Sequence, residues 1–342
     1  MFKPFSKSIS TVEKLNRLWN LVNSGDAMAI VVNADPDALA SALALRRLFW
    51  QKMPPARIVR INPIDRSDNL AMVRSLDIRL QHIRSLKRPV IDKWALVDSQ
   101  PSHNPLLGDI DFDIIIDHHP PGGDLNAPFI DIKEEYGATA TLMTDYLKAA
   151  GITPSARLAT ALFYAIKTDT ANFVRKTVSQ DLNAFRFLYD FANLKIIKKI
   201  ESSEITRDTL ESYKQGIQAL TFVGPMAVIY LGAVDKPDTL VQLGDFFMKM
   251  AEATWSVTAG IYEDTLIVVF RNAGIRNHAG ELAHSLLGDV GSAGGHKESA
   301  RAEVPLGNID CGTDGKRDCR GFLLKRLQDQ PLSRPEARGL GG

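Results

Sequence analysis

The stretch DIIIDHHPPGG, residues 113–123, begins as a buried strand and then turns abruptly polar. Its three consecutive isoleucines, residues 114–116, are typical of a strand that is covered on both faces. Asp117, His118 and His119 follow at once, and two prolines and two glycines then end any regular structure. In an open α/β sheet, residues at the exit of a strand line the ligand crevice. Taken alone, the stretch is either such a site or a polar turn that contains two histidines.

The first two-thirds of the chain alternates strand-like and helix-like segments. Apolar runs predict strands at residues 27–32, 56–62, 93–98 and 112–117. Helical periodicity predicts helices at residues 38–50, 68–76, 137–151 and 157–170. Because strands that alternate with helices form largely parallel sheets wrapped by those helices, this part predicts an α/β domain.

The remaining third of the chain has a different pattern. Residues 179–220 are charged and helical, and several strands then follow in succession before a helix at 279–289. We therefore predict a parallel-sheet α/β domain with flanking helices and a smaller α+β domain, joined by a helical connection. The predicted boundaries are 1–200 for the first domain, 201–220 for the connection, 221–330 for the second domain and 331–342 for a disordered tail rich in Pro, Gly and Arg.

Composition narrows the class of protein. Of 342 residues, 45% are hydrophobic and 24% charged, as in soluble globular proteins of two domains. The formal net charge of +1 argues against a protein that coats long nucleic acid by charge alone, but it leaves room for a local basic pocket. No apolar run approaches the roughly 18 residues of a membrane span, and the start has no signal-peptide core. The cysteines, Cys311 and Cys319, predict free thiols in a reducing cytoplasm.

Acidic residues recur where the predicted elements end. They are Asp35 and Asp37, with Asn33, after the first strand, Asp98 after the third, Asp117 with His118 after the fourth, and Asp169 at the end of an apolar helical segment. Strand ends in a parallel sheet lie along one edge, and carboxylates gathered there repel each other unless cations neutralise them. Oxygen and imidazole ligands suit Mn²⁺ or Mg²⁺, and the histidine favours Mn²⁺. The set predicts a metal centre, although each acidic strand end by itself is more often a turn or a helix cap.

Five motifs resemble, in order, those of the DHH phosphoesterase family of the RecJ superfamily: NADPDALASA, ALVDSQP, IIIDHHP, YGATAT and AIKTDT. Further on, VVFRN and GSAGGHKESARAEV resemble the arginine and the glycine-rich, histidine-ending segment of the family's DHH-associated C-terminal domain. The glycines of GSAGGHKES, residues 291–299, predict a flexible loop. The resemblance runs from about Met28 to Val304 and includes the members that act as nano-RNases or phosphoadenosine-phosphate phosphatases.

This resemblance implies a dimetal site in the first domain and a substrate clamp in the second. It implies that the metal ligands are Asp35, Asp37, Asp98, His118 and Asp169, with Asp98 bridging two Mn²⁺ ions and Mg²⁺ as an alternative metal. It also implies catalytic roles for His119, Asp98 and Asp117, where Asp117 orients a histidine and His119 faces the substrate phosphate. The substrate-binding residues would be Arg271, Gly294, Gly295 and His296.

The first motif departs from the family pattern. Many members place a metal-binding histidine six residues before the second aspartate, where this chain has Val31. RecJ-type exonucleases use an acidic residue two positions later, where this chain has Asn33. An asparagine oxygen can bind a hard ion but carries no charge, so the occupancy of the first metal position is left open. His103 is either a compensating ligand or an exposed loop residue.

We expect a cytoplasmic phosphoesterase that uses a hydroxide activated by two metal ions. Its expected substrates are short oligoribonucleotides, linear dinucleotides or 3′-phosphoadenosine 5′-phosphate. Neither long duplex nucleic acid nor a membrane is an expected partner, and a homodimer is left open. Two alternatives remain: a polyphosphate or pyrophosphate hydrolase of the same family, and a nucleotide-binding protein with a weakened metal site.

Overall fold

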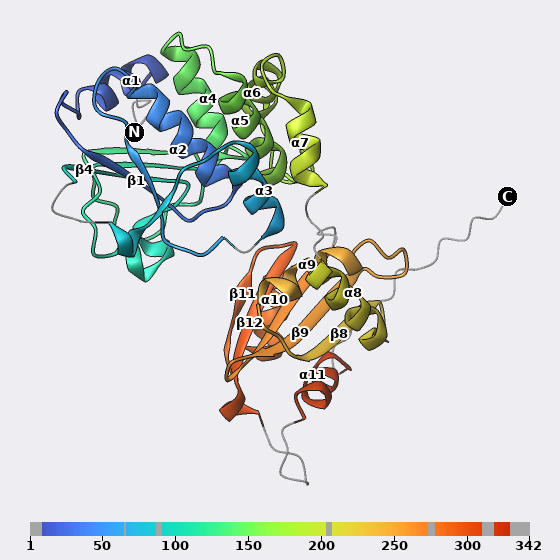
Figure 1. The fold of residues 1–342 in the computed structure, drawn as a ribbon. Coiled ribbons are helices and arrows are strands. Elements are labelled where there is room, and N and C mark those ends of the chain that lie inside the picture. The colour runs from blue at the N-terminus through green and yellow to red at the C-terminus, as the bar shows by residue number, and fades with distance from the viewer. Residues whose placement is uncertain are drawn as a thin grey trace, which may run out of the picture. The chain divides into compact units, whose positions relative to one another are not determined.

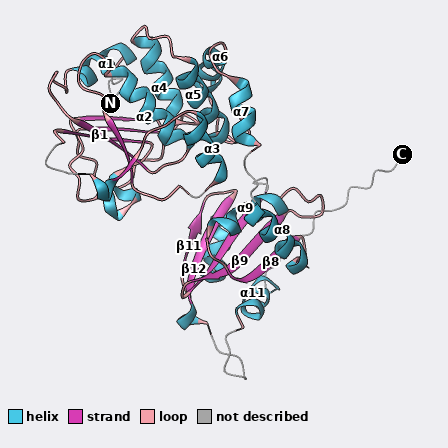
Figure 2. Ribbon diagram, in the orientation of Figure 1, coloured by secondary structure: helices cyan, strands magenta, loops and turns pink. Residues whose placement is uncertain are grey.

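The computed structural model describes residues 9–64, 66–86, 91–202, 207–272, 278–309 and 318–328. The chain divides into two compact units, Met1–Glu204 and Ile205–Gly342, each built on one six-stranded sheet (Figures 1 and 2). This arrangement confirms the predicted fold class, a parallel-sheet α/β part followed by a second part with its own sheet. The predicted disordered tail lies outside the described residues.

The sheet of the first unit is parallel throughout, in the order β3-β2-β1-β4-β5-β6. Its strands are β1 Met28–Val32, β2 Arg57–Arg60, β3 Gln81–His82, β4 Lys93–Val97, β5 Ile114–Asp117 and β6 Phe129–Ile132. Since β1 pairs with both β2 and β4, the order of the strands reverses between β1 and β4. In open parallel sheets, ligands bind beyond the carboxyl ends of the strands at such a reversal.

Seven helices accompany this sheet in the described residues. They are α1 Thr11–Trp19, α2 Pro36–Leu48, α3 Ser67–Ser75, α4 Thr139–Ala149, α5 Ala156–Asp169, α6 Ser179–Tyr189 and α7 Leu194–Glu201. Alternate residues of β1 serve two cores: Ile30 packs in the cluster that contains α2, α4 and α5, and Val31 in a separate cluster with Val59 and Leu96. The central helix α2 is alanine-rich and mostly buried, because small side chains allow it to pack closely against both α4 and α5.

The second unit has a mixed sheet in the order β11-β12-β10-β9-β8-β7, in which only β8 and β9 pair in parallel. Its strands are β7 Thr221–Val223, β8 Met226–Ala233, β9 Trp255–Tyr262, β10 Thr265–Asn272, β11 Ser292–Gly295 and β12 Ser299–Pro305. Helices α10 Ala279–Leu287 and α11 Cys319–Gln328 share one apolar core with this sheet, while α8 Arg207–Ala219 and α9 Asp238–Phe247 pack on it through others.

One segment of the second unit corrects the sequence-based prediction. Residues 291–299 were expected to form a flexible loop, but Ser292–Gly295 forms strand β11, paired with β12. The pairing needs only backbone groups, so the small side chains do not prevent it. Gly295 has a φ of +153°, and a Cβ there would lie 2.4 Å from the carbonyl oxygen of Ser299. A glycine therefore closes the β11–β12 turn.

Two further features concern membrane-spanning helices and the cysteines. None of the helices in the described ranges is long and apolar enough to cross a membrane. Cys319 is buried in the core of the second unit and forms no disulfide within the described residues, whereas Cys311 lies outside them.

Candidate metal centre

Two carboxylates come from the segment that joins β1 to α2. Asp35 is the N-cap of α2 and accepts a hydrogen bond from the backbone N–H of Ala38 at 2.9 Å. Asp37, in the first turn, is only 1% exposed and accepts hydrogen bonds from the N–H groups of Thr139 at 2.7 Å and Ala140 at 2.8 Å. Asp37 therefore joins the N-termini of α2 and α4, whose positive ends favour a carboxylate.

A third carboxylate follows β4, directly beside β1 in the sheet. Asp98 adopts a left-handed backbone conformation, with φ +58°, which aspartate and asparagine tolerate better than most residues. Its N–H donates to the carbonyl oxygen of Ile116 at 2.9 Å, and its carboxylate accepts a hydrogen bond from Thr139 Oγ1 at 2.8 Å. The turn thus holds a buried carboxylate against the start of α4.

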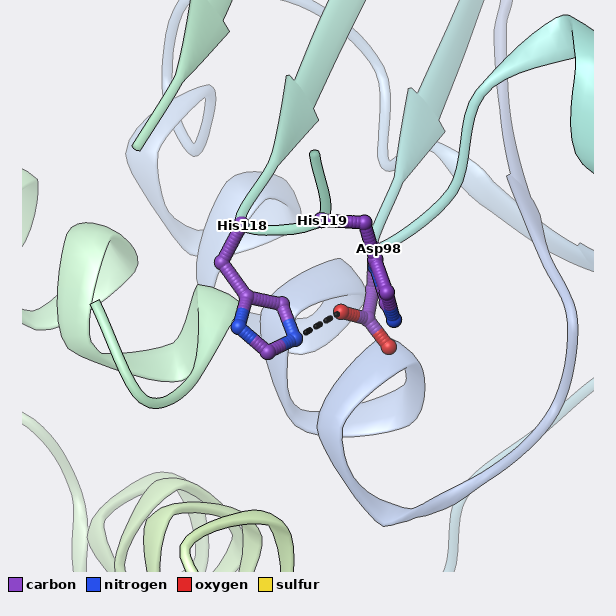
Figure 3. A group of neighbouring side chains, drawn as sticks. All are labelled: Asp98, His118 and His119. Atoms are coloured by element: carbon purple, nitrogen blue, oxygen red, sulfur yellow. Dashed lines mark ion pairs between the residues drawn. The ribbon is translucent and has the colours of Figure 1, made fainter. Parts of the chain in front are cut away.

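The imidazole of His118, which follows β5, meets carboxylates from three other elements. Its Nε2 lies 3.0 Å from Asp169 Oδ2 and 3.9 Å from Asp37 Oδ2. It also lies 3.5 Å from Asp98 Oδ1, the contact that Figure 3 marks with a dashed line. Its Nδ1 lies 3.2 Å from the carbonyl oxygen of Tyr136. Because a carbonyl can only accept, Nδ1 donates, and the neutral ring carries its lone pair on Nε2.

The carboxylates of this cluster hold protons more tightly than usual when no cation is present. Burial, reinforced by the charge of Asp169, raises the pKa of Asp37 to about 7 and that of Asp35 to about 6. Burial and the charges of its acidic neighbours raise the pKa of Asp98 well above its usual range. Burial lowers the pKa of His118, but Asp169 and Asp37 outweigh it and raise that pKa to about 9. Either bound protons or a bound cation must therefore offset the negative charge of this cluster.

The donor atoms fit a hard divalent ion such as Mn²⁺. The ligand atoms of Asp37, His118 and Asp169 lie within 4.8 Å of one another, as do those of Asp98, His118 and His119. His118 Nε2 is buried and faces three carboxylates, of which Asp169 is the nearest at 3.0 Å. A buried imidazole nitrogen among carboxylate oxygens is a mixed ligand set that suits Mn²⁺. Asp35 belongs to neither group.

A second set of contacts fixes the orientation of His119. Asp117 is completely buried and accepts hydrogen bonds from His119 Nδ1 at 2.8 Å and from Gln100 Nε2 at 2.7 Å. Burial alone would raise the pKa of Asp117, but these hydrogen bonds lower it, and the contact with Asp117 raises the pKa of His119. The side chain of His119 is 42% exposed. The ring of His119 is thus fixed in orientation and accessible beside the carboxylates, and its contact with Asp117 favours the charged form.

Three residues that the sequence analysis does not single out support the site. Thr139 is completely buried and donates two hydrogen bonds, one from its N–H to Asp37 and one from its hydroxyl to Asp98. Asp181, from α6, accepts two hydrogen bonds from the N–H of Gly137, each 3.0 Å long, and so holds the segment before α4. Gln100 contacts Asp117. Thr139 and Gln100 had a sequence signal, since they lie in the YGATAT and ALVDSQP motifs, whereas Asp181 lies in none of the quoted motifs.

The positions that depart from the family pattern lie in different environments. Val31 is completely buried in an apolar cluster with Val59 and Leu96, and Asn33 is exposed. His103 is exposed, and its Nδ1 accepts a hydrogen bond from the N–H of Gln100 at 3.3 Å. Its ring lies edge-on to His119, with centroids 5.4 Å apart. Val31 therefore offers no ligand, and His103 lies beside His119.

The predicted substrate-binding residues lie at one end of the sheet in the second unit. Arg271 pairs in register with Ser299, whose carbonyl oxygen accepts a hydrogen bond from the N–H of His296 at 2.8 Å. The guanidinium of Arg271 donates to Asp245 at 2.7 Å. A Cβ at Gly294 would meet nothing within 4 Å, so the fold itself does not require glycine there.

Residues 28–166 match the model of the DHH family, N-terminal domain. An uncharacterized protein of Methanocaldococcus jannaschii is 34% identical over 277 residues, which are 81% of this chain and 57% of that protein. A probable manganese-dependent inorganic pyrophosphatase of Deinococcus radiodurans is 28% identical over 154 residues, 44% of this chain and 48% of that protein. The chain thus spans about half the length of these curated relatives.

Among solved structures, an exopolyphosphatase-related protein from Bacteroides fragilis superposes with a TM-score of 0.72. The superposition covers 95% of this chain and 98% of that protein, at 14% sequence identity. At this identity the likeness shows a shared fold.

Proposed function

We propose that the chain is a manganese-dependent phosphoesterase of short nucleotides, because its residues 28–166 match the model of the DHH family, N-terminal domain. The proposed substrates are oligoribonucleotides a few units long, linear dinucleotides or 3′-phosphoadenosine 5′-phosphate. The observation that carries the proposal is the convergence of Asp37, Asp98 and Asp169 on the buried Nε2 of His118. The manganese-dependent relative from Deinococcus radiodurans supports the choice of metal.

We assign the metal ligands to this one edge of the parallel sheet. The residues that would hold two ions are Asp35, Asp37, Asp98, His118 and Asp169, with Asp98 shared. When bound, such ions polarise a phosphoryl oxygen and make a water acidic enough to attack phosphorus near neutral pH. Thr139 and the start of α4 hold the carboxylates of Asp37 and Asp98 in place for this role.

His119 is the proposed contact for the phosphate that reacts. Asp117 holds its Nδ1, and this contact raises the pKa of His119, which favours the charged form of the ring. A charged imidazole placed beside the metal centre can donate to a nonbridging oxygen, whose negative charge grows in the transition state. Asp117 acts through His119 as a positioning residue.

In the second unit, Arg271, Gly294, Gly295 and His296 are the proposed contacts for a terminal nucleotide. An arginine can grip a phosphate with two parallel hydrogen bonds, and the open surface at Gly294 lets a ligand approach the backbone. Replacing His296 with alanine should spare Mn²⁺ binding and lower kcat/KM on a dinucleotide by about 30- to 1,000-fold, as the loss of a charge-assisted contact does. Hydrolysis of a small activated phosphate ester should be nearly unchanged. Equal losses on both substrates would contradict the role of His296.

The nearest alternative is a hydrolase of inorganic polyphosphate or pyrophosphate, which the pyrophosphatase relative favours. The deciding experiment supplies the purified protein and Mn²⁺ with dinucleotides, short RNAs, phosphoadenosine phosphate, polyphosphate and pyrophosphate, and separates the products. Our proposal predicts hydrolysis of the nucleotide substrates. Preferential hydrolysis of polyphosphate or pyrophosphate would contradict the substrate class, and no hydrolysis of any substrate would favour a nucleotide-binding protein.

A further inference from the structure

Two adjoining cavities in the first unit are lined by arginines and lie away from the metal centre. The first has a volume of about 200 Å³ and is lined by Leu43, Arg46, Arg47, Trp50, Ser155, Arg157 and Leu158. The second has a volume of about 240 Å³ and is lined by Arg46, Ala56, Arg57, Ile58, Arg79, Leu80 and Gln81. Arg46 lines both. Within the described residues, no acidic side chain lines either cavity.

We call the five arginines of these cavities the arginine surface: Arg46, Arg47, Arg57, Arg79 and Arg157. In the described part of the chain, Arg46, Arg47 and Arg57 take part in no ion pair. Asp77 lies 4.0 Å from both Arg79 and Arg157, at the limit of an ion pair.

This gathering of like charges stands out in a protein with a formal net charge of only +1. Burial, together with the charge of Arg157, lowers the pKa of the Arg46 guanidinium, so the arginines oppose one another when no anion is present. The first cavity also contains the start of α5, where Ser155 is the N-cap, and a helix N-terminus adds partial positive charge. A bound polyanion would relieve this repulsion.

An aromatic side chain accompanies the charges. Trp50 lines the first cavity and is 56% exposed, although tryptophan is usually well buried. Most of the first cavity's lining is otherwise apolar, from Leu43, Leu158 and the stems of the arginines. Arginines beside an exposed indole are the combination that holds phosphates and stacks a base of a single strand.

We propose that the arginine surface and Trp50 bind single-stranded nucleic acid, with a base against Trp50 and the neighbouring phosphates on the arginines. A lipid surface or a free phosphate would use the arginines without needing a flat ring inside the cavity. Duplex nucleic acid keeps its bases stacked inside, where Trp50 has no access to them.

This surface is distinct from the metal centre. Helix α2 runs from Pro36 to Leu48, so Asp37 and Arg46 lie nine residues, or about 14 Å, apart along its axis. That distance is about four phosphate spacings of a strand, more than a dinucleotide contains, so a dinucleotide bound at the metal centre does not extend to the arginine surface. The surface therefore retains longer strands, and the hydrolysis of dinucleotides does not depend on it.

The test measures binding without hydrolysis. The full-length protein, in EDTA, is titrated into a fluorescein-labelled 12-nucleotide oligodeoxyadenylate, and anisotropy is followed at several NaCl concentrations. The variants are Arg46→Ala, Trp50→Ala and Trp50→Phe, with Arg186→Ala as the matched control, since Arg186 is an exposed arginine on α6. A double variant, Arg47→Ala with Arg57→Ala, changes only exposed side chains and serves if Arg46→Ala does not fold.

We expect Arg46→Ala to weaken binding at least tenfold and to lower the slope of log K against log salt by about 0.7, the value of one phosphate contact on a single strand. Trp50→Ala should weaken binding by about 5- to 150-fold, while Trp50→Phe stays near wild type because a ring remains. Arg186→Ala should bind as wild type, and Arg46→Ala should still hydrolyse a dinucleotide in Mn²⁺.

Three results would overturn the assignment. The first is wild-type binding by Arg46→Ala and Trp50→Ala. The second is a loss in Arg46→Ala with none in Trp50→Ala, which describes a plain anion site. The third is Arg46-dependent binding of phosphatidylglycerol vesicles by a protein that does not bind the oligonucleotide. The binding assays need neither Mn²⁺ nor turnover. Their failure would therefore contradict the arginine surface without contradicting the proposed phosphoesterase.

Discussion

Replacing Thr139 with valine should weaken Mn²⁺ binding by removing one hydroxyl and changing little else. Thr139 is completely buried, and its Oγ1 donates to a carboxylate oxygen of Asp98 at 2.8 Å. A hydrogen bond to a charged group contributes about 1.5–3 kcal/mol, which is about 10- to 150-fold in an equilibrium constant. Loss of a group that orients a metal ligand typically costs about 10- to 100-fold in affinity or activity. We therefore expect Thr139→Val to bind Mn²⁺ about 10- to 100-fold more weakly, with a comparable fall in kcat/KM.

Helix α4 supplies a matched control for this experiment. Thr144 is also completely buried, but its Oγ1 donates at 2.7 Å to the carbonyl oxygen of Ala140 and to no carboxylate. Calorimetric titration with Mn²⁺, together with thermal unfolding, should give Thr144→Val a wild-type affinity. If Thr139→Val and Thr144→Val bind Mn²⁺ equally well, the start of α4 does not hold Asp98 for the metal, and this part of the reasoning is refuted.

Three further predictions concern the same centre. Asp98→Asn retains a residue type that tolerates the left-handed backbone and should abolish turnover without unfolding the protein; activity within about tenfold of wild type at saturating Mn²⁺ would contradict a shared ligand. His119→Ala should lower kcat/KM by about 10²- to 10³-fold, measured on a dinucleotide, and an unchanged value would exclude its contact with the phosphate. The metal-free protein should lose thermal stability as pH rises from 5 to 9. Folding raises the pKa of Asp35 to about 6, that of Asp37 to about 7 and that of His118 to about 9. The protonated forms that stabilise the folded state are therefore lost over this pH range. Since metal binding needs deprotonated ligands, Mn²⁺ should raise Tm more at pH 8 than at pH 5, and differential scanning fluorimetry in EDTA and in Mn²⁺ checks both signs.

Much of the first unit could be predicted from the sequence, because its central strands are strongly apolar and each is followed by a polar residue. Ile114–Ile116 indicates a strand covered on both faces, and the structure buries all three side chains completely. The short strands were not predictable in the same way. Strand β3 has two residues, β6 alternates apolar and polar over only four, and β11 is Ser-Ala-Gly-Gly, so none of them has the continuous apolar run that marks the equally short β5.

The residues of the candidate site could be predicted from the sequence only where a residue directly follows a predicted strand or ends a predicted helix. Asp37, Asp98 and His118 satisfy that condition. Asp181 does not, because it holds the segment before α4 from a helix more than 40 residues later along the chain, and nothing in its local sequence marks it. The arginine surface was equally hidden, since its members come from α2, β2, the segment before β3 and the start of α5.

The most direct test of the metal centre is a crystal grown with Mn²⁺ and measured for anomalous scattering at the manganese edge. Our account predicts two anomalous peaks about 4 Å apart, with Asp37, His118 and Asp169 bound to manganese and Asp98 contacting both ions. Peaks elsewhere, or no peak at His118 Nε2 under saturating Mn²⁺, would contradict it.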